Sequence, residues 1–400
     1  MSFSPTSDSP PHGSIEEQRE RWERKRIRIS KELVQTEQKY CQQLQLITTY
    51  FVEILAAKGT LKPDVRGSIF SSIKHIHSLN QALLVHLENG YLGRGLDQFC
   101  PELHHYRVYA DNFYSAQRVL RTQLKKSKAF RRFKKLQESR PEFKGQSLEE
   151  LLELPLVRAQ QYKQFVEDLA SNTSPQHHEF QQLSRAVGAL SELSDRIEEN
   201  SRRHENQLQL QRVQRLLTGK TRVQKPGRWY IREGWLKVVP PKGSDPKAHM
   251  FFLFSDVLLQ TRRSSALSLS SGERFEVRRV FPLSECAVDK VFGHTRSQGG
   301  LLNLSFPKAR LLLMSSDQDD FNDWVTCLTS AVRQFQSKPT VIHDKVSPEP
   351  ESSSAPQRKR PLRGQDPVSP PETDSSAPKR RRQEPAAQSV DSSSSSCVIL

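Results

Sequence analysis

The stretch ISKELVQTEQKYCQQL, residues 29–44, has the residue spacing of an amphipathic helix. Its core-type positions recur every three or four residues, which at about 100° per residue places them on one face. These positions are Ile29, Leu33, Thr36, Tyr40 and Leu44, followed by Ile47. Glu32 lies roughly 60° from the centre of that face. We interpret Glu32 either as a contact for a second surface or as a solvated acid that pairs with a neighbouring helix residue.

Helix signals continue on both sides of this stretch. The capping-box sequence SIEE, residues 14–17, predicts the start of a long helix that ends at Lys58 and Gly59. SLEE, residues 147–150, predicts another helix start, and Ser174 followed by Pro175 predicts a third. Together with further amphipathic stretches, these signals predict an elongated all-α bundle of about six helices. We assign it residues 15–218.

Residues 219–336 have the pattern of a small β domain. Short alternating or aromatic-rich runs are separated by clusters of Gly, Pro, Ser and Asp, which is typical of antiparallel strands. An acidic segment at 317–320 then opens a helix whose apolar face includes Phe321, Trp324 and Leu328. This order predicts a small antiparallel β-barrel capped by a C-terminal helix, with Trp324 buried.

Both ends of the chain have the composition of disordered tails. Residues 1–14 and 337–400 are rich in Ser, Pro and charged residues and nearly free of aromatic residues. The net charge is +16, and the C-terminal tail, with ten basic and eight acidic residues, contributes only +2. The folded part is therefore strongly basic, which predicts an acidic partner or an anionic membrane surface. Without a zinc-finger spacing, an RNP-like strand or a helix-turn-helix signal, we expect no nucleic-acid partner.

The sequence lacks the patterns of covalent catalysis. TGKT, residues 218–221, resembles the end of a phosphate-binding loop, but Gln214 stands where that loop requires its first glycine. The histidine pairs at 104–105 and 177–178 have no ligand at helical spacing, which favours exposed histidines over a metal site. We expect no covalent chemistry, no metal and no cofactor.

The spacing of the cysteines and the length of the apolar runs bear on the cellular compartment and on membrane insertion. Five widely spaced cysteines without a signal peptide predict a reducing, cytosolic or nuclear setting. No run approaches the about eighteen apolar residues of a transmembrane helix.

Three blocks of the predicted bundle carry a family resemblance. They are RISKELVQTEQKYCQQL at 28–44, IFSSIKHIHSLNQALLVHLE at 69–88 and LLELPLVRAQQYKQFVEDL at 151–169. In this order they resemble the conserved blocks of the Dbl-homology domain, a helical bundle that exchanges nucleotide on Rho-family GTPases. The barrel pattern that follows resembles the pleckstrin-homology domain that comes next in that family. The resemblance covers roughly residues 20–335 and implies a Rho-family guanine nucleotide exchange factor.

The resemblance also implies roles for single residues. Glu32 corresponds to the glutamate that contacts the first switch of the GTPase and helps to draw it away from nucleotide and magnesium. Thr36, Arg158, Gln161 and Glu198 are further GTPase-binding positions by the same resemblance. The family usually has Lys or Arg at the position of Gln161 and Asn at that of Glu198, so this chain presents a different charge to the second switch. The alternative function is a non-catalytic adaptor that binds a GTPase or phosphoinositides through a degenerate exchange site.

The barrel has a candidate lipid site by resemblance. Pleckstrin-homology barrels often bind phosphoinositides through basic residues on the first two strands, where this chain has Lys237, Lys242 and Lys247. His249 replaces an arginine that is expected there, so a merely basic, solvated loop is the alternative.

The last four residues, CVIL, form a C-a-a-X signal. A terminal leucine predicts geranylgeranylation of Cys397. Basic clusters at 358–363 and 379–382 would add attraction to an anionic leaflet, which predicts anchoring to the cytosolic face of the plasma membrane. The same clusters could instead form a nuclear import signal, so a partly nuclear basic protein is a further alternative.

Overall fold

The computed structural model describes residues 12–241, 245–264, 273–291 and 300–337, with side chains from residue 16 onward. Two candidate site residues, Lys242 and Cys397, lie outside the described residues, as do almost all of the two predicted tails. None of the described helices combines the length and the apolar character needed to cross a membrane.

The first predicted helix is present but interrupted. It comprises α1 (His12–Leu46), a π-helical segment (Ile47–Glu53) and α2 (Ile54–Lys58). It ends as predicted, because Gly59 adopts the left-handed conformation with φ 59° that glycine tolerates without strain. The helix begins two residues before Ser14, so the predicted capping box is not its start.

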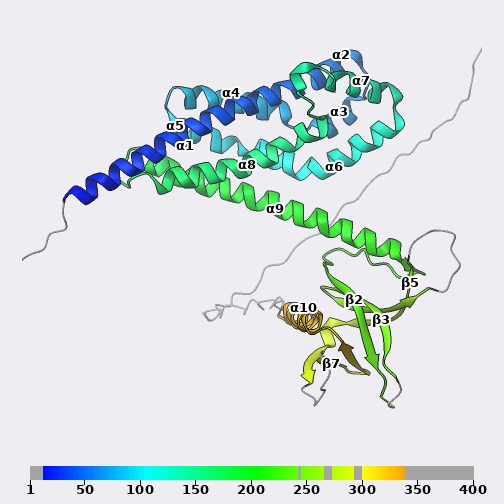
Figure 1. Ribbon diagram of the computed structural model, residues 1–400. Helices are drawn as coiled ribbons and strands as arrows, with labels where there is room; N and C mark the ends of the chain where they lie inside the picture. The colour runs from blue at the N-terminus through cyan, green and yellow to red at the C-terminus, as the bar shows by residue number, and fades with distance from the viewer. Residues whose placement is uncertain (1–11, 242–244, 265–272, 292–299, 338–400) are drawn as a thin grey trace, which may run out of the picture. The chain divides into compact units, whose positions relative to one another are not determined.

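The other helices complete the bundle. They are α3 (Pro63–Phe70), α4 (Ile73–Glu88), α5 (Leu92–Phe99), α6 (His104–Lys126), α7 (Lys128–Glu138), α8 (Leu148–Ser171) and α9 (Phe180–Leu216), with short 3-10 segments at Cys100–Leu103 and Pro141–Phe143. The bundle therefore contains more helices than the six expected. α1, α8 and α9 follow one another side by side in Figure 1.

Of the two helix starts predicted at Ser147 and Ser174, the structure confirms only the first. The capping box of α8 is confirmed, since Ser147 accepts a hydrogen bond from the Glu150 amide and the Glu150 carboxylate accepts one from the Ser147 amide. The start at Ser174 is wrong, because α9 begins at Phe180. The cause is tertiary: Glu179, just before the helix, accepts a hydrogen bond from the Gly93 amide at 2.7 Å and pairs with Arg26.

The apolar stripe of the quoted stretch forms part of the bundle core. Leu33, Tyr40, Leu44 and Ile47 are at most 3% exposed, and each fully buried leucine or isoleucine contributes roughly 1.5–3 kcal/mol to stability. Ile29 and Thr36 are only half-buried, because they line a surface groove.

Among its described residues, the β domain forms one eight-stranded sheet in the order β1-β5-β4-β3-β2-β8-β7-β6. The strands are β1 (Leu217–Thr218), β2 (Tyr230–Val239), β3 (Lys247–Phe254), β4 (Val257–Arg263), β5 (Phe275–Pro282), β6 (Ala287–Val291), β7 (Gly300–Phe306) and β8 (Ala309–Ser315). All neighbouring pairs are antiparallel except β1 with β5, which is a short parallel pair. Phe281 of β5 stacks on Phe306 of β7 at 4.9 Å although these strands are not neighbours, so the sheet curls over a common core as a barrel does.

The C-terminal helix α10 (Gln318–Gln336) closes this core. Asp317 caps it by accepting hydrogen bonds from the amides of Asp319 and Asp320. Trp324 is fully buried, as predicted, and its indole approaches Gly234 of β2 so closely that a Cβ there would lie 3.2 Å from Nε1. The Trp324 side chain therefore packs α10 directly against β2.

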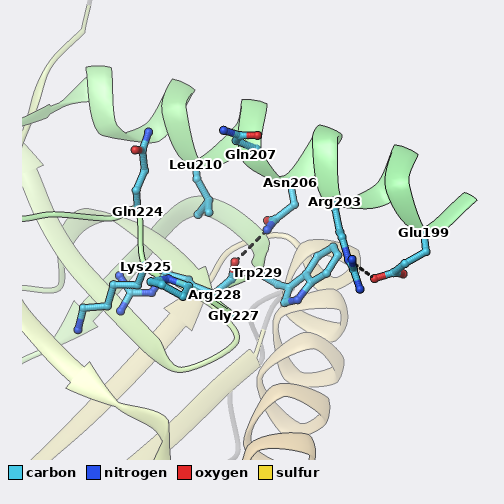
Figure 2. Close-up of a pocket in the computed structure, with 11 residues that line it drawn as sticks. Glu199, Arg203, Asn206, Gln207, Leu210, Gln224, Lys225, Gly227, Arg228 and Trp229 are labelled. Atoms are coloured by element: carbon cyan, nitrogen blue, oxygen red, sulfur yellow. Dashed lines mark hydrogen bonds and ion pairs between the residues drawn. The ribbon is translucent and has the colours of Figure 1, made fainter. Parts of the chain in front are cut away.

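The end of α9 packs on the sheet. Leu210 and Val213 of α9 are buried in one cluster with Leu217 of β1, Phe252 of β3 and Phe275 of β5. Asn206 donates a hydrogen bond to the Arg228 carbonyl oxygen at 2.9 Å (Figure 2) and accepts one from the Tyr230 amide at 2.8 Å. The last turns of α9 thus belong to the core of the β domain as well as to the bundle.

We expect Trp324→Ala to destabilise the β domain by about 3–5 kcal/mol, because it removes the largest side chain of a closed core and leaves a cavity. Urea unfolding followed by circular dichroism measures the change. Trp235→Ala is the matched control, since that indole is 40% exposed and its removal should cost much less. Equal losses from the two substitutions would contradict this account of the core.

Candidate functional site

A shallow pocket of about 310 Å³ lies between α1 and α8. It is lined by Ile29, Glu32 and Thr36 from α1 and by Gln161, Gln164, Phe165 and Asp168 from α8. Three of the five GTPase-binding residues implied by the sequence therefore lie at one groove. These are Glu32, Thr36 and Gln161.

Glu32 is exposed at the rim of the groove. Within the described part of the chain its carboxylate has no hydrogen-bond or ion-pair partner, so no neighbouring helix residue neutralises it. Its carbonyl oxygen accepts a hydrogen bond from the Thr36 hydroxyl at 2.9 Å. The carboxylate is thus a free anion on a rigid helix.

Arg158 lies beneath the groove and not on its surface. Its side chain is 3% exposed and donates through Nε and Nη2 to Glu37 Oε2 at 3.1 and 2.7 Å. Through Nη1 it donates to Thr36 Oγ1 at 3.0 Å and to Gln161 Oε1 at 3.1 Å. Arg158 therefore holds two groove residues in place and reaches a bound partner only through them.

Glu37 is the residue that the sequence reasoning missed. It is completely buried, and its Oε2 also accepts a hydrogen bond from the Tyr162 hydroxyl at 2.5 Å. The signal was present, because Glu37 falls between Leu33 and Tyr40 at helical spacing and therefore on the apolar face. An acid on a buried face requires a partner, and Arg158 occupies the corresponding buried face of α8.

Burial and the partner side chains act in opposite directions on the pKa values of Glu37 and Arg158. Burial raises the pKa of the Glu37 carboxyl, and Arg158 and Tyr162 oppose that rise. Burial also lowers the pKa of Arg158, but Tyr162 and Glu37 reverse this, so the net direction is upward and the guanidinium stays charged. Arg158 is thus charged throughout the physiological pH range. Its hydrogen bonds to the groove residues Thr36 and Gln161 depend on Glu37, which positions the guanidinium.

Hydrogen bonds extend from this pair across the bundle. The Tyr162 hydroxyl lies 2.6 Å from Asn80 Oδ1, and Asn80 Nδ2 donates to the Tyr106 hydroxyl at 2.8 Å. Tyr106 in turn contacts the Tyr40 hydroxyl at 3.1 Å. The network joins α1, α4, α6 and α8, and burial raises the pKa of all three tyrosines, which stay protonated as donors.

The remaining implied residues are dispersed. Glu198 is exposed on α9 and does not line the groove. Lys237 and Lys247 are exposed on β2 and β3, but Lys237 pairs in register with Ala248, and Lys247 with Val238. Because side chains alternate along a strand, the two lysines project from opposite faces of the β2–β3 ribbon. They do not converge on one headgroup by themselves.

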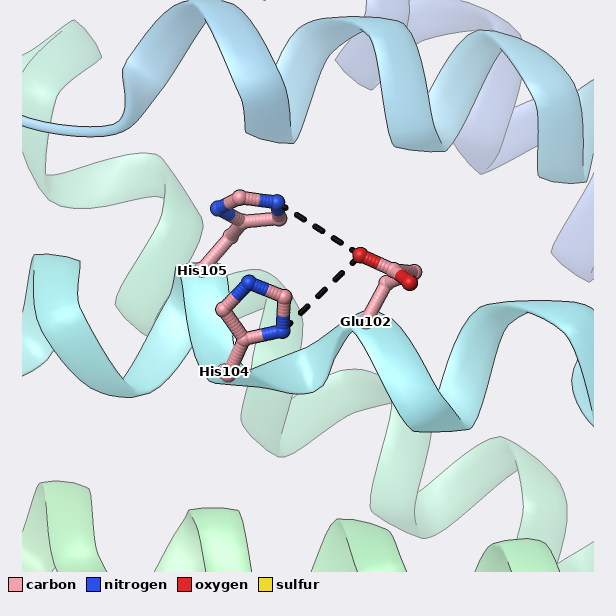
Figure 3. Close-up of side chains that lie close together, drawn as sticks. All are labelled: Glu102, His104 and His105. Carbon is pink, nitrogen blue, oxygen red and sulfur yellow. Dashed lines mark ion pairs between the residues drawn. The ribbon is translucent and has the colours of Figure 1, made fainter.

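Each histidine pair lies next to a carboxylate, which the helical-spacing argument missed. Glu102 Oε2 lies 3.8 Å from His104 Nδ1 and 3.5 Å from His105 Nε2 (Figure 3). These three are the right ligand types for a transition metal, but Glu102 and His104 are exposed. The second set contains His177, His178 and Glu179, where Arg26 already contacts His177 and Glu179.

Comparison with known proteins agrees with the fold. The RhoGEF domain matches residues 29–198, and the PH domain matches residues 230–333. The chain belongs to the RhoGEF family, and its RhoGEF match precedes its PH match.

Among relatives, Rho guanine nucleotide exchange factor 39 of Bos taurus is 46% identical over 330 residues, which are 81% of this chain and 98% of that protein. The Homo sapiens protein of that name is 46% identical over 320 residues, with 80% and 95% covered.

Solved structures share the fold. Vav1 bound to an allosteric inhibitor has a TM-score of 0.62 at 19% identity, covering 77% of this chain and 81% of that one. The DH/PH domain of human ARHGEF11, solved in a ternary complex with human RhoA and its inhibitor, has a TM-score of 0.57 at 18% identity, covering 77% and 94%.

We expect Arg158→Met to destabilise the bundle by about 3–5 kcal/mol, because it leaves the Glu37 carboxyl buried without its cation. Urea unfolding of this variant, of Glu37→Gln and of the double variant measures the coupling between the two sites. The double variant should recover part of the loss. Arg185→Met, which breaks an exposed pair with Asp97, is the control and should cost at most about 1 kcal/mol. Strict additivity of the two buried substitutions would contradict the pairing.

Proposed function

We propose that the α1–α8 groove is the surface through which this chain, a Rho-family guanine nucleotide exchange factor, engages the switch segments of its GTPase. The observation that carries this is the free Glu32 carboxylate beside Thr36 and Gln161, both held from below by Arg158. An anion fixed on a rigid helix can compete with the nucleotide for switch residues and for magnesium.

Exchange by this surface requires no covalent step. A factor that binds the nucleotide-free GTPase more tightly than the loaded one speeds release by that difference alone, at about 1.4 kcal/mol for each factor of ten. The groove supplies two carboxylates, from Glu32 and Asp168, together with a hydroxyl and amides, which are binding groups. Its role is to stabilise the empty GTPase until GTP enters.

We expect Glu32→Ala to slow nucleotide release at least about tenfold, because it removes one charge-assisted contact that forms only with the displaced switch. Release of fluorescent GDP from Rho, Rac and Cdc42 measures the rate and identifies the preferred GTPase. Glu20→Ala removes an exposed acid from the same helix outside the groove and serves as control. An unchanged rate in a folded Glu32→Ala sample would refute the mechanism.

The adaptor alternative rests on Gln161 and Glu198, which change the charge offered to the second switch. Gln161 directs its amide oxygen to Arg158, so its amide nitrogen is left for the partner and can still donate hydrogen bonds. Exchange therefore remains the favoured function. If the folded chain bound these GTPases without accelerating release from any of them, the adaptor would replace it.

The tail supports a further proposal, that the chain works while anchored to the cytosolic face of the plasma membrane. Cys397 in the CVIL terminus accepts a geranylgeranyl group, and the basic clusters add electrostatic attraction. One lipid chain alone anchors marginally, whereas a chain with basic residues holds stably.

We expect Cys397→Ser to move the protein from the membrane fraction to the soluble fraction of cells, because it removes the prenyl acceptor. Leu400→Ser keeps the cysteine and favours farnesylation, so this control should stay largely membrane-bound. Fractionation and fluorescence imaging measure both. Nuclear accumulation that Cys397→Ser leaves unchanged would favour the nuclear alternative.

A further inference from the structure

A second pocket, of about 530 Å³, lies between α6 and α9 on the bundle. Its cationic lining comes from Arg118, Arg121 and Lys125 of α6, and His204 of α9 lies opposite. Among the described residues that line it there is no Asp or Glu. None of these residues belongs to the α1–α8 groove.

The three cations share one face of α6, since their spacings are three and four residues. All three are exposed, and none forms an ion pair within the described residues; the Arg121 side chain donates a hydrogen bond to Gln117 Oε1 at 3.5 Å. Elsewhere on α6, Arg107 pairs with Glu192 and Asp111 with Arg196, whereas Lys126 is exposed and has no ion pair among the described residues. Like charges at this spacing repel one another, so the face gains stability when an anion binds.

Uncharged donors complete the wall of the pocket. The His204 ring stacks on Tyr114 with centroids 3.9 Å apart and planes within 10°, which fixes its orientation. Burial and the nearby Arg121 lower the pKa of His204, so the neutral ring offers one N–H donor. The amides of Gln207 and Gln211 also line the pocket.

The C-terminal end of α6 would ordinarily repel an anion, because its last carbonyls carry partial negative charge. Arg131 occupies these carbonyls, donating to Leu124 O at 2.9 Å and to Lys125 O at 3.3 Å. Lys126, the last residue of α6, and Lys128, the first of α7, are exposed. The field at this end of the helix is therefore positive.

We propose that this pocket binds a polyphosphorylated inositol ring. From Arg118 to Lys125 the cations extend over about 10 Å of helix, at 1.5 Å per residue, so a single phosphate cannot contact all of them. A ring that carries several phosphates can, and arginine forks match phosphate oxygens in pairs. This ligand site is additional to the exchange groove and to the barrel lysines.

The test is calorimetric titration of the full chain with inositol hexakisphosphate. Arg118→Gln combined with Arg121→Gln should weaken binding about tenfold or more, because two charge-assisted contacts are lost. Lys25→Gln combined with Arg28→Gln is the matched control, with the same charge change and the same three-residue spacing on exposed positions of α1. Lys237→Gln combined with Lys247→Gln removes the barrel lysines, and the α6 effect should persist in that background.

A second arm distinguishes the two sources of the headgroup. Sedimentation with phosphatidylcholine vesicles that contain a phosphoinositide, against vesicles with phosphatidylserine at equal charge, shows whether a lipid-borne ring is bound. Binding that depends on Arg118 and Arg121 supports the proposal in either arm, and identifies a lipid headgroup or a soluble ligand accordingly.

Equal weakening by the α1 control, or no weakening by the α6 substitutions, would overturn the proposal. Tighter binding of single-stranded RNA than of the inositol phosphate at the same arginines would also overturn it. Melting curves verify that each variant is folded. GDP release from a soluble GTPase, measured on the same samples, should not change, so failure here is separate from failure of the exchange mechanism.

Discussion

The ion pair between Glu37 and Arg158 is the interaction on which the α1–α8 groove depends. Two charges removed from water are tolerated when they are paired and hydrogen-bonded, and here Tyr162, Thr36 and Gln161 make further hydrogen bonds to the pair. The pair joins α1 to α8 at the point where both helices present their groove residues. The buried pair therefore helps to fix how α1 lies against α8. The positions of the groove side chains above it depend on that alignment.

This arrangement separates structure from recognition within one segment of sequence. Within about one and a half turns of α1, Glu32 is exposed and free, whereas Glu37 is buried and paired. A binding surface that acts by differential affinity needs such rigidity, since a mobile carboxylate would lose part of its contact energy in becoming ordered. The chain thus leaves one acid unpaired at the groove and buries another, which holds Arg158 and through it the groove residue Thr36.

The basic side chains of the surface differ in whether they have acidic partners. Many surface arginines of the bundle are neutralised by carboxylates, while those of the α6 face remain unpaired beside a pocket. The β2 and β3 lysines point away from one another, so the basic net charge does not by itself locate a ligand site on the barrel. The places where basic side chains come together depend on helix faces and strand register. The net charge of the chain gives no information about either.

The sequence by itself determined the order of domains, the apolar stripe of α1, the capping box of α8 and the buried Trp324, because each follows from local periodicity and capping chemistry. It also placed Glu32 at the margin of a buried face. Only the tertiary structure decided that α9 starts at Phe180, that Arg158 lies under the groove, and that Arg118, Arg121 and His204 meet. These outcomes depend on contacts between residues far apart in the chain, and local propensity carries no information about which distant side chain will satisfy a buried charge.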